Sequence, residues 1–157
     1  MCLGWTLPVL TTDRLILREV TMNDAEAMFK FSSNDNVSRY LLWETHQTLE
    51  DTQAFIEMAL ESYDMQEFYH WGMEFNGQLI GTIDYVGLNE YSGIGEIGYV
   101  LSEDYWNKGL VTEAAKRIID FGFDELELVR IQARCIAENR ASSRVMEKCG
   151  MTFEGTH

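Results

Sequence analysis

The chain has 157 residues, a length that fits a single domain with a substantial buried core. With 46% hydrophobic and 24% charged residues the composition is that of a folded globular protein, and no stretch approaches the ~20 apolar residues of a membrane span. A formal net charge of −14 opposes binding to nucleic acid or to an anionic membrane, because most of the surface would repel phosphates. We therefore expect neither a nucleic-acid nor a membrane partner.

The opening "MCLGWTLPVL" lacks the basic region of a signal peptide, and its apolar run is short, which predicts a cytoplasmic location. The three cysteines form no CxxC pair, and the three histidines are scattered without metal-ligand spacing. The sequence therefore predicts reduced thiols and no metal site.

The first half of the chain predicts one strand and two helices. "RLILREV", residues 14–20, alternates in the manner of a strand. Thr21 follows, with an aspartate three residues on, which is a capping-box pattern for a helix over 22–31. The same pattern recurs at Thr48, which opens the amphipathic segment "TLEDTQAFIEMALESY".

The second half predicts mainly strands. Asn76-Gly77 separates "FYHWGMEF" from "QLIGTIDYV", which predicts a hairpin, because this dipeptide accepts the positive φ values of a type I′ turn. The further predicted elements are a strand over 94–101, a helix over 110–122, a strand over 128–135, a helix over 140–149 and a strand from residue 151. The fold class expected from this order is α/β, with a mixed, largely antiparallel sheet and helices on both faces.

The segment "YWNKGLVTEA" places Gly109 directly before the helix that starts at residue 110. The first N–H groups of a helix lack partners and its dipole is positive there, so this position favours an anion. Lys108 adds a charge and Thr112 a hydroxyl donor, which together suit a pyrophosphate. Walker and Rossmann glycine patterns are absent, and a simple loop before a helix remains the alternative.

Four stretches of the sequence together resemble the GNAT superfamily of acyl-CoA-dependent N-acetyltransferases, and within it the ribosomal-protein N-terminal alanine acetyltransferases. These stretches are "LTTDRLILREV", "IGEIGYVLSEDYWNKGLVTEA", "LVRIQARCIAENRASSRVMEKCGM" and the run of strands and helices between them. The likeness covers essentially the whole chain. It implies one N-acetyltransferase domain over 1–157, acetyl-CoA as cosubstrate, and a V-shaped gap between splayed fourth and fifth strands for the pantetheine arm.

The resemblance also assigns the cofactor-binding residues. The family loop pattern Gln/Arg-x-x-Gly-x-Gly/Ala falls on residues 106–111, from which Trp106 and Val111 depart, and the backbone of the fourth strand would pair with pantetheine. The residues expected to contact the cofactor are Tyr99, Val100, Leu101, Trp106, Asn107, Lys108, Gly109, Leu110, Val111, Thr112, Asn139, Ser142 and Arg144.

Acetyl transfer to an amine needs a base, and Glu96 is the candidate that the sequence offers. It is a carboxylate within the apolar strand "IGEIGYV", where burial would raise its pKa toward a useful range. Alternation places it on the face opposite Ile97 and Tyr99, and family members often carry a catalytic glutamate on this strand. A cross-strand or rim carboxylate is the alternative interpretation.

Three residues near the end of the chain take their expected roles from the family's Asn-x-x-Ser segment. Asn139 would bind the amide region of the cofactor, although it also suits a helix N-cap. Ser142 would protonate the leaving thiolate, with Tyr85 and Tyr99 as competitors for that role. Arg144 would neutralise the 3′-phosphate or lie in water.

The expected reaction is acetyl transfer from acetyl-CoA to a primary amine, a protein N-terminus or a small basic amine, by direct attack. Residues 44–74 contain eight carboxylates and no Lys or Arg, which would suit a basic acceptor, or be a solvated helix face. Family relatives continue past "FEGTH" with a further strand, which leaves three alternatives: the given sequence stops short of that strand, a partner subunit completes the sheet in a homodimer, or the last strand is dispensable. A noncatalytic acyl-CoA-binding regulatory module is the alternative.

Overall fold

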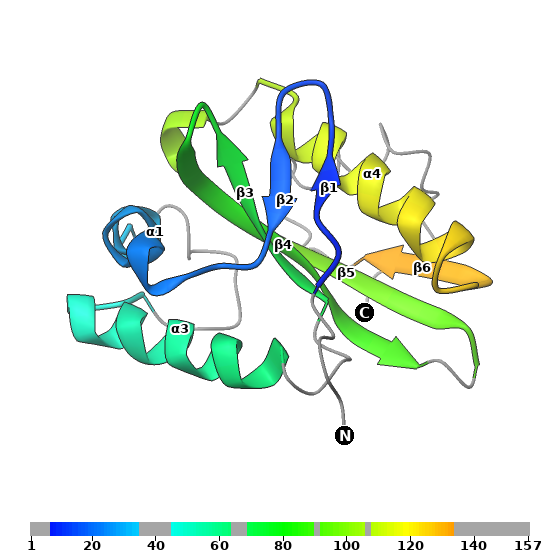
Figure 1. Ribbon diagram of the computed structural model, residues 1–157, viewed down its shortest axis with the longest axis horizontal. Coiled ribbons are helices and arrows are strands. Elements are labelled where there is room, and N and C mark those ends of the chain that lie inside the picture. Colours follow the sequence, from blue (N-terminus) through cyan, green and yellow to red (C-terminus); the bar gives the residue numbers. More distant parts are fainter. Residues whose placement is uncertain (1–6, 35–44, 64–68, 90–91, 106–107, 134–157) are drawn as a thin grey trace.

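The computed structural model describes residues 7–34, 45–63, 69–89, 92–105 and 108–133 (Figure 1). Within these ranges six strands form one sheet in the order β1-β2-β3-β4-β5-β6, and every neighbouring pair is antiparallel except β5 and β6. The strands are β1 (Leu10–Thr11), β2 (Ile16–Arg18), β3 (His70–Phe75), β4 (Gln78–Asn89), β5 (Ile94–Leu101) and β6 (Arg130–Ala133).

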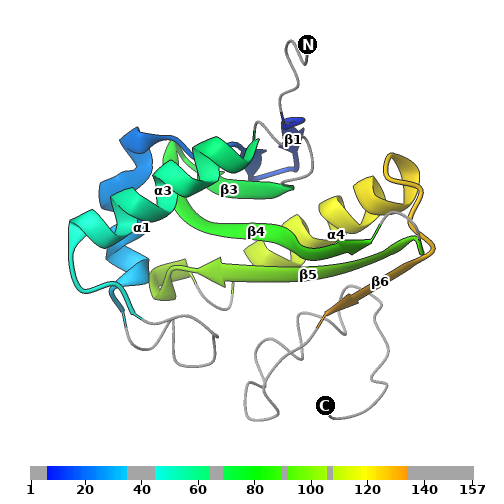
Figure 2. The same cartoon turned by 90° about the horizontal axis from the view of Figure 1, so that it is seen from below.

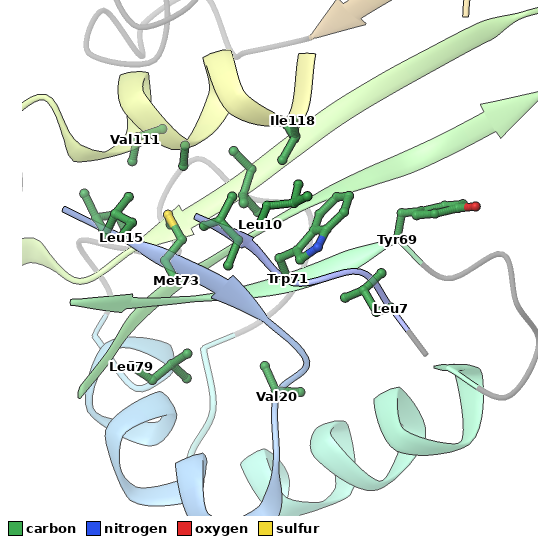
Figure 3. Close-up of a cluster of buried hydrophobic side chains, with 14 of the residues drawn as sticks. Leu7, Leu10, Leu15, Val20, Tyr69, Trp71, Met73, Leu79, Val111 and Ile118 are labelled. Atoms are coloured by element: carbon green, nitrogen blue, oxygen red, sulfur yellow. The ribbon is translucent and has the colours of Figure 1, made fainter. Parts of the chain in front are cut away.

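Helices cover both faces of this sheet. They are α1 (Ala25–Ser32), α3 (Leu49–Tyr63) and α4 (Leu110–Asp124), with short 3-10 turns η1 (Met22–Asp24) and η2 (Glu103–Tyr105). Figure 3 shows α4 on one side of the strands, and α1 and α3 on the other. The predicted fold class is therefore confirmed. None of the described helices is long and apolar enough to cross a membrane.

The predicted boundaries agree closely in the middle of the chain. β5 has the predicted ends, and α4 begins at the predicted Leu110 but continues to Asp124. β1 is an additional strand, and its two residues are too few to show alternation in the sequence. The predicted helix over 140–149 and the strand from residue 151 lie outside the described residues.

The Asn76-Gly77 turn joins β3 and β4 as predicted. Asn76 has φ 52° and Gly77 φ 79°, the positive values that a type I′ turn requires. Phe75 pairs with Gln78 across the turn, and the ladder then shifts by one residue between Met73 and Glu74. This bulge decides which side chains of β3 and β4 lie opposite one another.

Both predicted helix starts carry the expected cap. The N–H of Thr21 donates to Asp24 Oδ2 at 2.8 Å, at the start of η1, which continues into α1. Before α3, the N–H of Thr48 donates to Asp51 Oδ2 at 3.2 Å, and the N–H of Asp51 donates to Thr48 Oγ1 at 3.3 Å. Each cap satisfies donors that a helix start would otherwise leave unpaired.

The core beneath α4 is built on aromatic side chains. Trp71 is fully buried among the core side chains (Figure 3). Its ring centroid lies 5.6 Å from that of Phe121 in α4. Tyr69 packs on both rings, at 6.1 Å from Trp71 and 5.9 Å from Phe121. The Tyr85 hydroxyl of β4 donates to the Ile118 carbonyl of α4. Together these contacts fix the position of α4 on the sheet.

An arginine bound by two carboxylates joins β2 to η1 and β3. The Arg18 guanidinium donates to both oxygens of Asp24, at 2.9 and 3.0 Å, and to Glu74 Oε1 at 2.7 Å. Burial alone would raise the pKa of Asp24, but hydrogen bonds from Arg18 and from the Thr21 amide outweigh it and hold the pKa below its ordinary value of 3.8.

We expect Asp24→Asn to lower the free energy of unfolding by about 1.5–3 kcal/mol at neutral pH, because the variant loses charged hydrogen bonds. A depressed carboxyl pKa stabilises the fold fully above the ordinary value of 3.8, and this contribution disappears as the pH falls through the lower folded value. Urea unfolding over a pH series should therefore show the difference between wild type and variant shrinking in acid. A difference that is independent of pH would contradict this account.

Candidate active site

The N-terminus of α4 has the geometry that the sequence predicts. Gly109 is the N-cap residue, with φ 75° and ψ 8°, a left-handed conformation that favours glycine. Lys108 before it is exposed, whereas Leu110 and Val111 are buried in the core. Val111, a departure from the family pattern, therefore directs its side chain into the core and leaves only its backbone to the loop.

The turn between β1 and β2 holds this helix start. Arg14 Nε donates to Glu113 Oε1 at 2.9 Å, and Arg14 Nη1 donates to the Lys108 carbonyl at 3.0 Å. The Arg14 amide and the Thr12 hydroxyl both donate to Glu113 Oε2. These contacts were not predicted from the sequence, in which Thr12 and Arg14 are marked only by belonging to the "LTTDRLILREV" stretch.

Glu113 remains ionised in this arrangement. Burial alone would raise its pKa, but the hydrogen bonds from Thr12 and Arg14 outweigh burial and lower the pKa below 4.5. Its carboxylate is therefore a charged anchor for the β1–β2 turn at neutral pH.

The predicted gap lies between β5 and its parallel neighbour β6. β6 pairs with β5 from Ile94 to Ile97, as far as the described part of the chain reaches. In Figure 2, β6 slopes away from β5. On its other side, the end of β5 remains paired with β4, with Tyr99 opposite Ile83 and Leu101 opposite Gly81. The predicted gap beside residues 99–101 depends on the chain after Ala133, which lies outside the described residues, so it stays a prediction.

Glu96 lies on the face of the sheet covered by α1 and α3. Its neighbour Ile97 pairs with Tyr85, whose hydroxyl binds α4, so alternation turns Glu96 to the opposite face. The side chain is half-buried, and Glu96 Oε1 accepts a hydrogen bond from Gln132 Nε2 at 3.1 Å. The predicted face is therefore observed, together with a cross-strand contact, while the role as base remains a prediction.

A histidine and an aspartate in hydrogen-bond contact lie on the same face. His70 Nδ1 is 2.9 Å from Asp84 Oδ2, and the His70 ring packs edge-on against Phe55 of α3. Asp84 also pairs in register with Gly98 of β5. His70, Asp84 and Gly98 therefore lie opposite one another across β3, β4 and β5. This pair was not anticipated, because the bulge between Met73 and Glu74 sets its register.

Two of the residues considered as proton donors to the leaving thiolate, Tyr85 and Tyr99, are among the described residues. Tyr85 is buried, its hydroxyl donates to the Ile118 carbonyl, and burial raises its pKa well above the ordinary value of 10.0. This geometry argues against Tyr85 as the donor to the thiolate. Tyr99 lies on the face opposite Glu96. Ser142, the predicted donor, lies outside the described residues, as do the predicted cofactor-binding residues Trp106, Asn107, Asn139 and Arg144.

Comparison with known proteins identifies the family. A model of the acetyltransferase (GNAT) domain matches residues 14–152. YoaA of Bacillus subtilis (strain 168), described as an uncharacterized N-acetyltransferase, is 37% identical over 150 residues, covering 94% of this chain and 85% of YoaA. Spermidine N(1)-acetyltransferase of Escherichia coli (strain K12) is 28% identical over 143 residues, covering 88% of this chain and 73% of the relative.

Solved structures agree in fold. A GNAT-family acetyltransferase from Bacillus anthracis superposes with a TM-score of 0.83 at 33% identity, covering 94% of this chain and 86% of that one. The Microcin C7 self immunity acetyltransferase MccE, solved with acetyl-CoA and AMP, has a TM-score of 0.83 at 22% identity, covering 92% and 82%. This chain belongs to the GNAT family of acetyltransferases. It is an acyl-CoA-dependent N-acetyltransferase.

We predict that Gly109→Ala weakens CoA binding. A Cβ at φ 75° costs about 1–2 kcal/mol and would stand where the anion must approach the backbone. Gly77→Ala is the matched control, since Gly77 has φ 79° and a Cβ there meets nothing within 4 Å. Calorimetry should give a raised Kd for CoA with Gly109→Ala alone, while both variants lower the melting temperature. Equal Kd values would argue against the anion site.

Proposed function

We propose that this protein transfers an acetyl group from acetyl-CoA to a basic primary amine by direct attack, with Glu96 as general base. One observation carries the proposal: Gly109 caps the start of α4 in a left-handed conformation, and Arg14 of the β1–β2 turn holds the carbonyl of the residue before it. The N–H groups and the positive dipole end of a helix start suit a diphosphate.

The residues around this helix start fit the cosubstrate. Among the described residues, a Cβ at Gly109 would come within 4 Å only of Arg14 Nη2, at 3.5 Å, so the backbone is open to close approach. The amides of residues 109–112 and the charge of Lys108 would hold the diphosphate. Tyr99, Val100 and Leu101 would offer backbone groups to the pantetheine arm. Acetyl-CoA, when bound, supplies the thioester carbonyl that the amine attacks.

The transfer forms one C–N bond and breaks one C–S bond. The amine nitrogen attacks the thioester carbon, its proton passes to Glu96, and the leaving sulfur takes up a proton, for which we propose Ser142. Gln132 donates a hydrogen bond to Glu96 Oε1 and so orients the carboxylate. The Gln132 amide is not a base, so it does not compete with Glu96 for the proton of the amine. Trp106, Asn107, Asn139 and Arg144 complete the proposed cofactor site.

A basic acceptor is supported by the charges on the Glu96 face. Asp84 and Glu96 lie on the same side of the sheet, diagonally across β4 and β5, where both carboxylates attract a cation. On α3, by contrast, Glu50, Glu57 and Glu61 are exposed, which fits a solvated face that steers rather than contacts the acceptor. A polyamine, as the name of the spermidine relative states for that protein, and a protein N-terminus are the two acceptor classes.

Two further parts of the proposal concern the whole molecule. A noncatalytic acyl-CoA-binding module is disfavoured, because the relatives and the family model are named for acetyl transfer. We propose that the protein is cytoplasmic and forms a homodimer, and light scattering after gel filtration tests the dimer.

Glu96→Gln should lower kcat by about 10²–10⁴-fold, the usual contribution of a general base, and leave the Kd of acetyl-CoA unchanged. The assay is thiol release with an amine panel of polyamines, N-terminal peptides and aminoglycosides. Glu125→Gln, at an exposed position after α4, is the matched control and should behave as wild type. Retention of full kcat in Glu96→Gln would exclude Glu96 as the base.

For Asp84→Asn we predict a KM about tenfold higher for spermidine, with a smaller change for a monoamine of similar length. A tenfold change corresponds to about 1.4 kcal/mol, within the range of a charged hydrogen bond to a second ammonium. Asp124→Asn, at an exposed position of α4, controls for the charge change. Equal effects on both amines would mean that Asp84 does not recognise the second cation.

A further inference from the structure

We propose that Arg14 is a positioning residue for the diphosphate of acetyl-CoA: it holds the Lys108–Gly109 peptide group so that its N–H, and not its carbonyl, faces the anion. This inference rests on the proposed diphosphate site at α4. It adds a residue 94 positions away in the chain from Lys108, on the turn between β1 and β2.

The Arg14 guanidinium is held from two sides. Its Nη1 donates to the Lys108 carbonyl at 3.0 Å, and its Nε donates to Glu113 Oε1 at 2.9 Å. Its own amide donates to Glu113 Oε2 at 3.0 Å. The side chain therefore bridges the residue before the N-cap and the first turn of α4, which an arginine fork can do in one orientation.

The orientation of one peptide group follows from this contact. A trans peptide is planar, with its C=O and N–H pointing in opposite directions, and the described chain has no cis peptide. Because the Lys108 carbonyl points toward Arg14, the Gly109 N–H points away from the β1–β2 turn. Without Arg14 this peptide could rotate and present its oxygen, which carries partial negative charge, to the diphosphate.

Glu113 shows why the bridge matters for an anion. A carboxylate in the first turn of a helix interacts with the same positive helix end as a bound phosphate. Thr12 and Arg14 both donate to this carboxylate, and the Leu15 amide donates to Thr12 Oγ1 at 3.0 Å, which fixes the hydroxyl. Glu113 is therefore tied to the β1–β2 turn, and its charge is paired there rather than set against the diphosphate.

The experiment compares two acetyl donors that differ in the diphosphate. kcat/KM is measured with acetyl-CoA and with acetyl-pantetheine for wild type, Arg14→Gln, Arg14→Lys and Lys116→Gln, alongside the Kd of acetyl-CoA and the melting temperature. Lys116 is exposed on α4 and provides the same loss of charge. We expect Arg14→Gln to reduce kcat/KM about tenfold with acetyl-CoA and not with acetyl-pantetheine, while Lys116→Gln changes neither.

Each other outcome has a definite meaning. Arg14→Lys keeps the charge but not the fork, so it should resemble Arg14→Gln; activity like wild type would overturn the positioning role. Equal losses with both donors would mean a structural brace only, and would also overturn it. If Arg14→Gln fails to fold, Arg14→Lys carries the test. Failure of wild type to bind acetyl-CoA would instead refute the proposed function itself.

Discussion

The structure depends on the attachment of α4 to the sheet at both of its ends. Toward its C-terminus, Phe121 packs against Trp71 and Tyr69, and the Ile118 carbonyl accepts the hydroxyl of Tyr85. At its N-terminus, Glu113 is bound by the β1–β2 turn. A helix fixed at both ends keeps the amides of its first turn in one place. An anion site needs donors that are already oriented, because binding then costs less conformational entropy. The aromatic core and the proposed cofactor loop are therefore connected through α4, whose position depends on the contacts at both of its ends.

Side chains alternate along each strand, so one face of the sheet carries core residues and the other carries the residues of the proposed chemistry. Residues such as Tyr85 and Ile97 face α4 and are buried, whereas Glu96 and Asp84 face α1 and α3. A shift of one residue would exchange the two faces, so the irregularities of register decide what the site contains. The shift between Tyr85 and Gly87 is one such place, since it aligns Glu96 with Gly87 and leaves Asp84 opposite Gly98.

Local chemistry made several features predictable. The Asn76-Gly77 turn, the caps at Thr21 and Thr48 and the left-handed Gly109 each follow from preferences of residues within a few positions. The contacts between distant segments did not follow. An unbroken hairpin from the Phe75–Gln78 pair would set His70 opposite Ile83, and the bulge moves Asp84 there instead. No local pattern encodes that shift, nor the meeting of Arg14 with Glu113 across 99 positions.

The large negative charge of the chain raises an electrostatic question, because acetyl-CoA is itself anionic. At physiological ionic strength the Debye length is about 8 Å, so exposed carboxylates farther away act weakly on a bound diphosphate. In the proposed site the neighbouring groups matter most: the amides at the start of α4, the charge of Lys108, and the Arg14 guanidinium, whose Nη2 lies 3.5 Å from the Cβ position of Gly109. Glu113, the nearest carboxylate of that helix turn, is paired with the same guanidinium. In the proposed function the net charge would favour a basic acceptor, since the Asp84 and Glu96 face would attract a cationic amine without weakening the local contacts to the diphosphate.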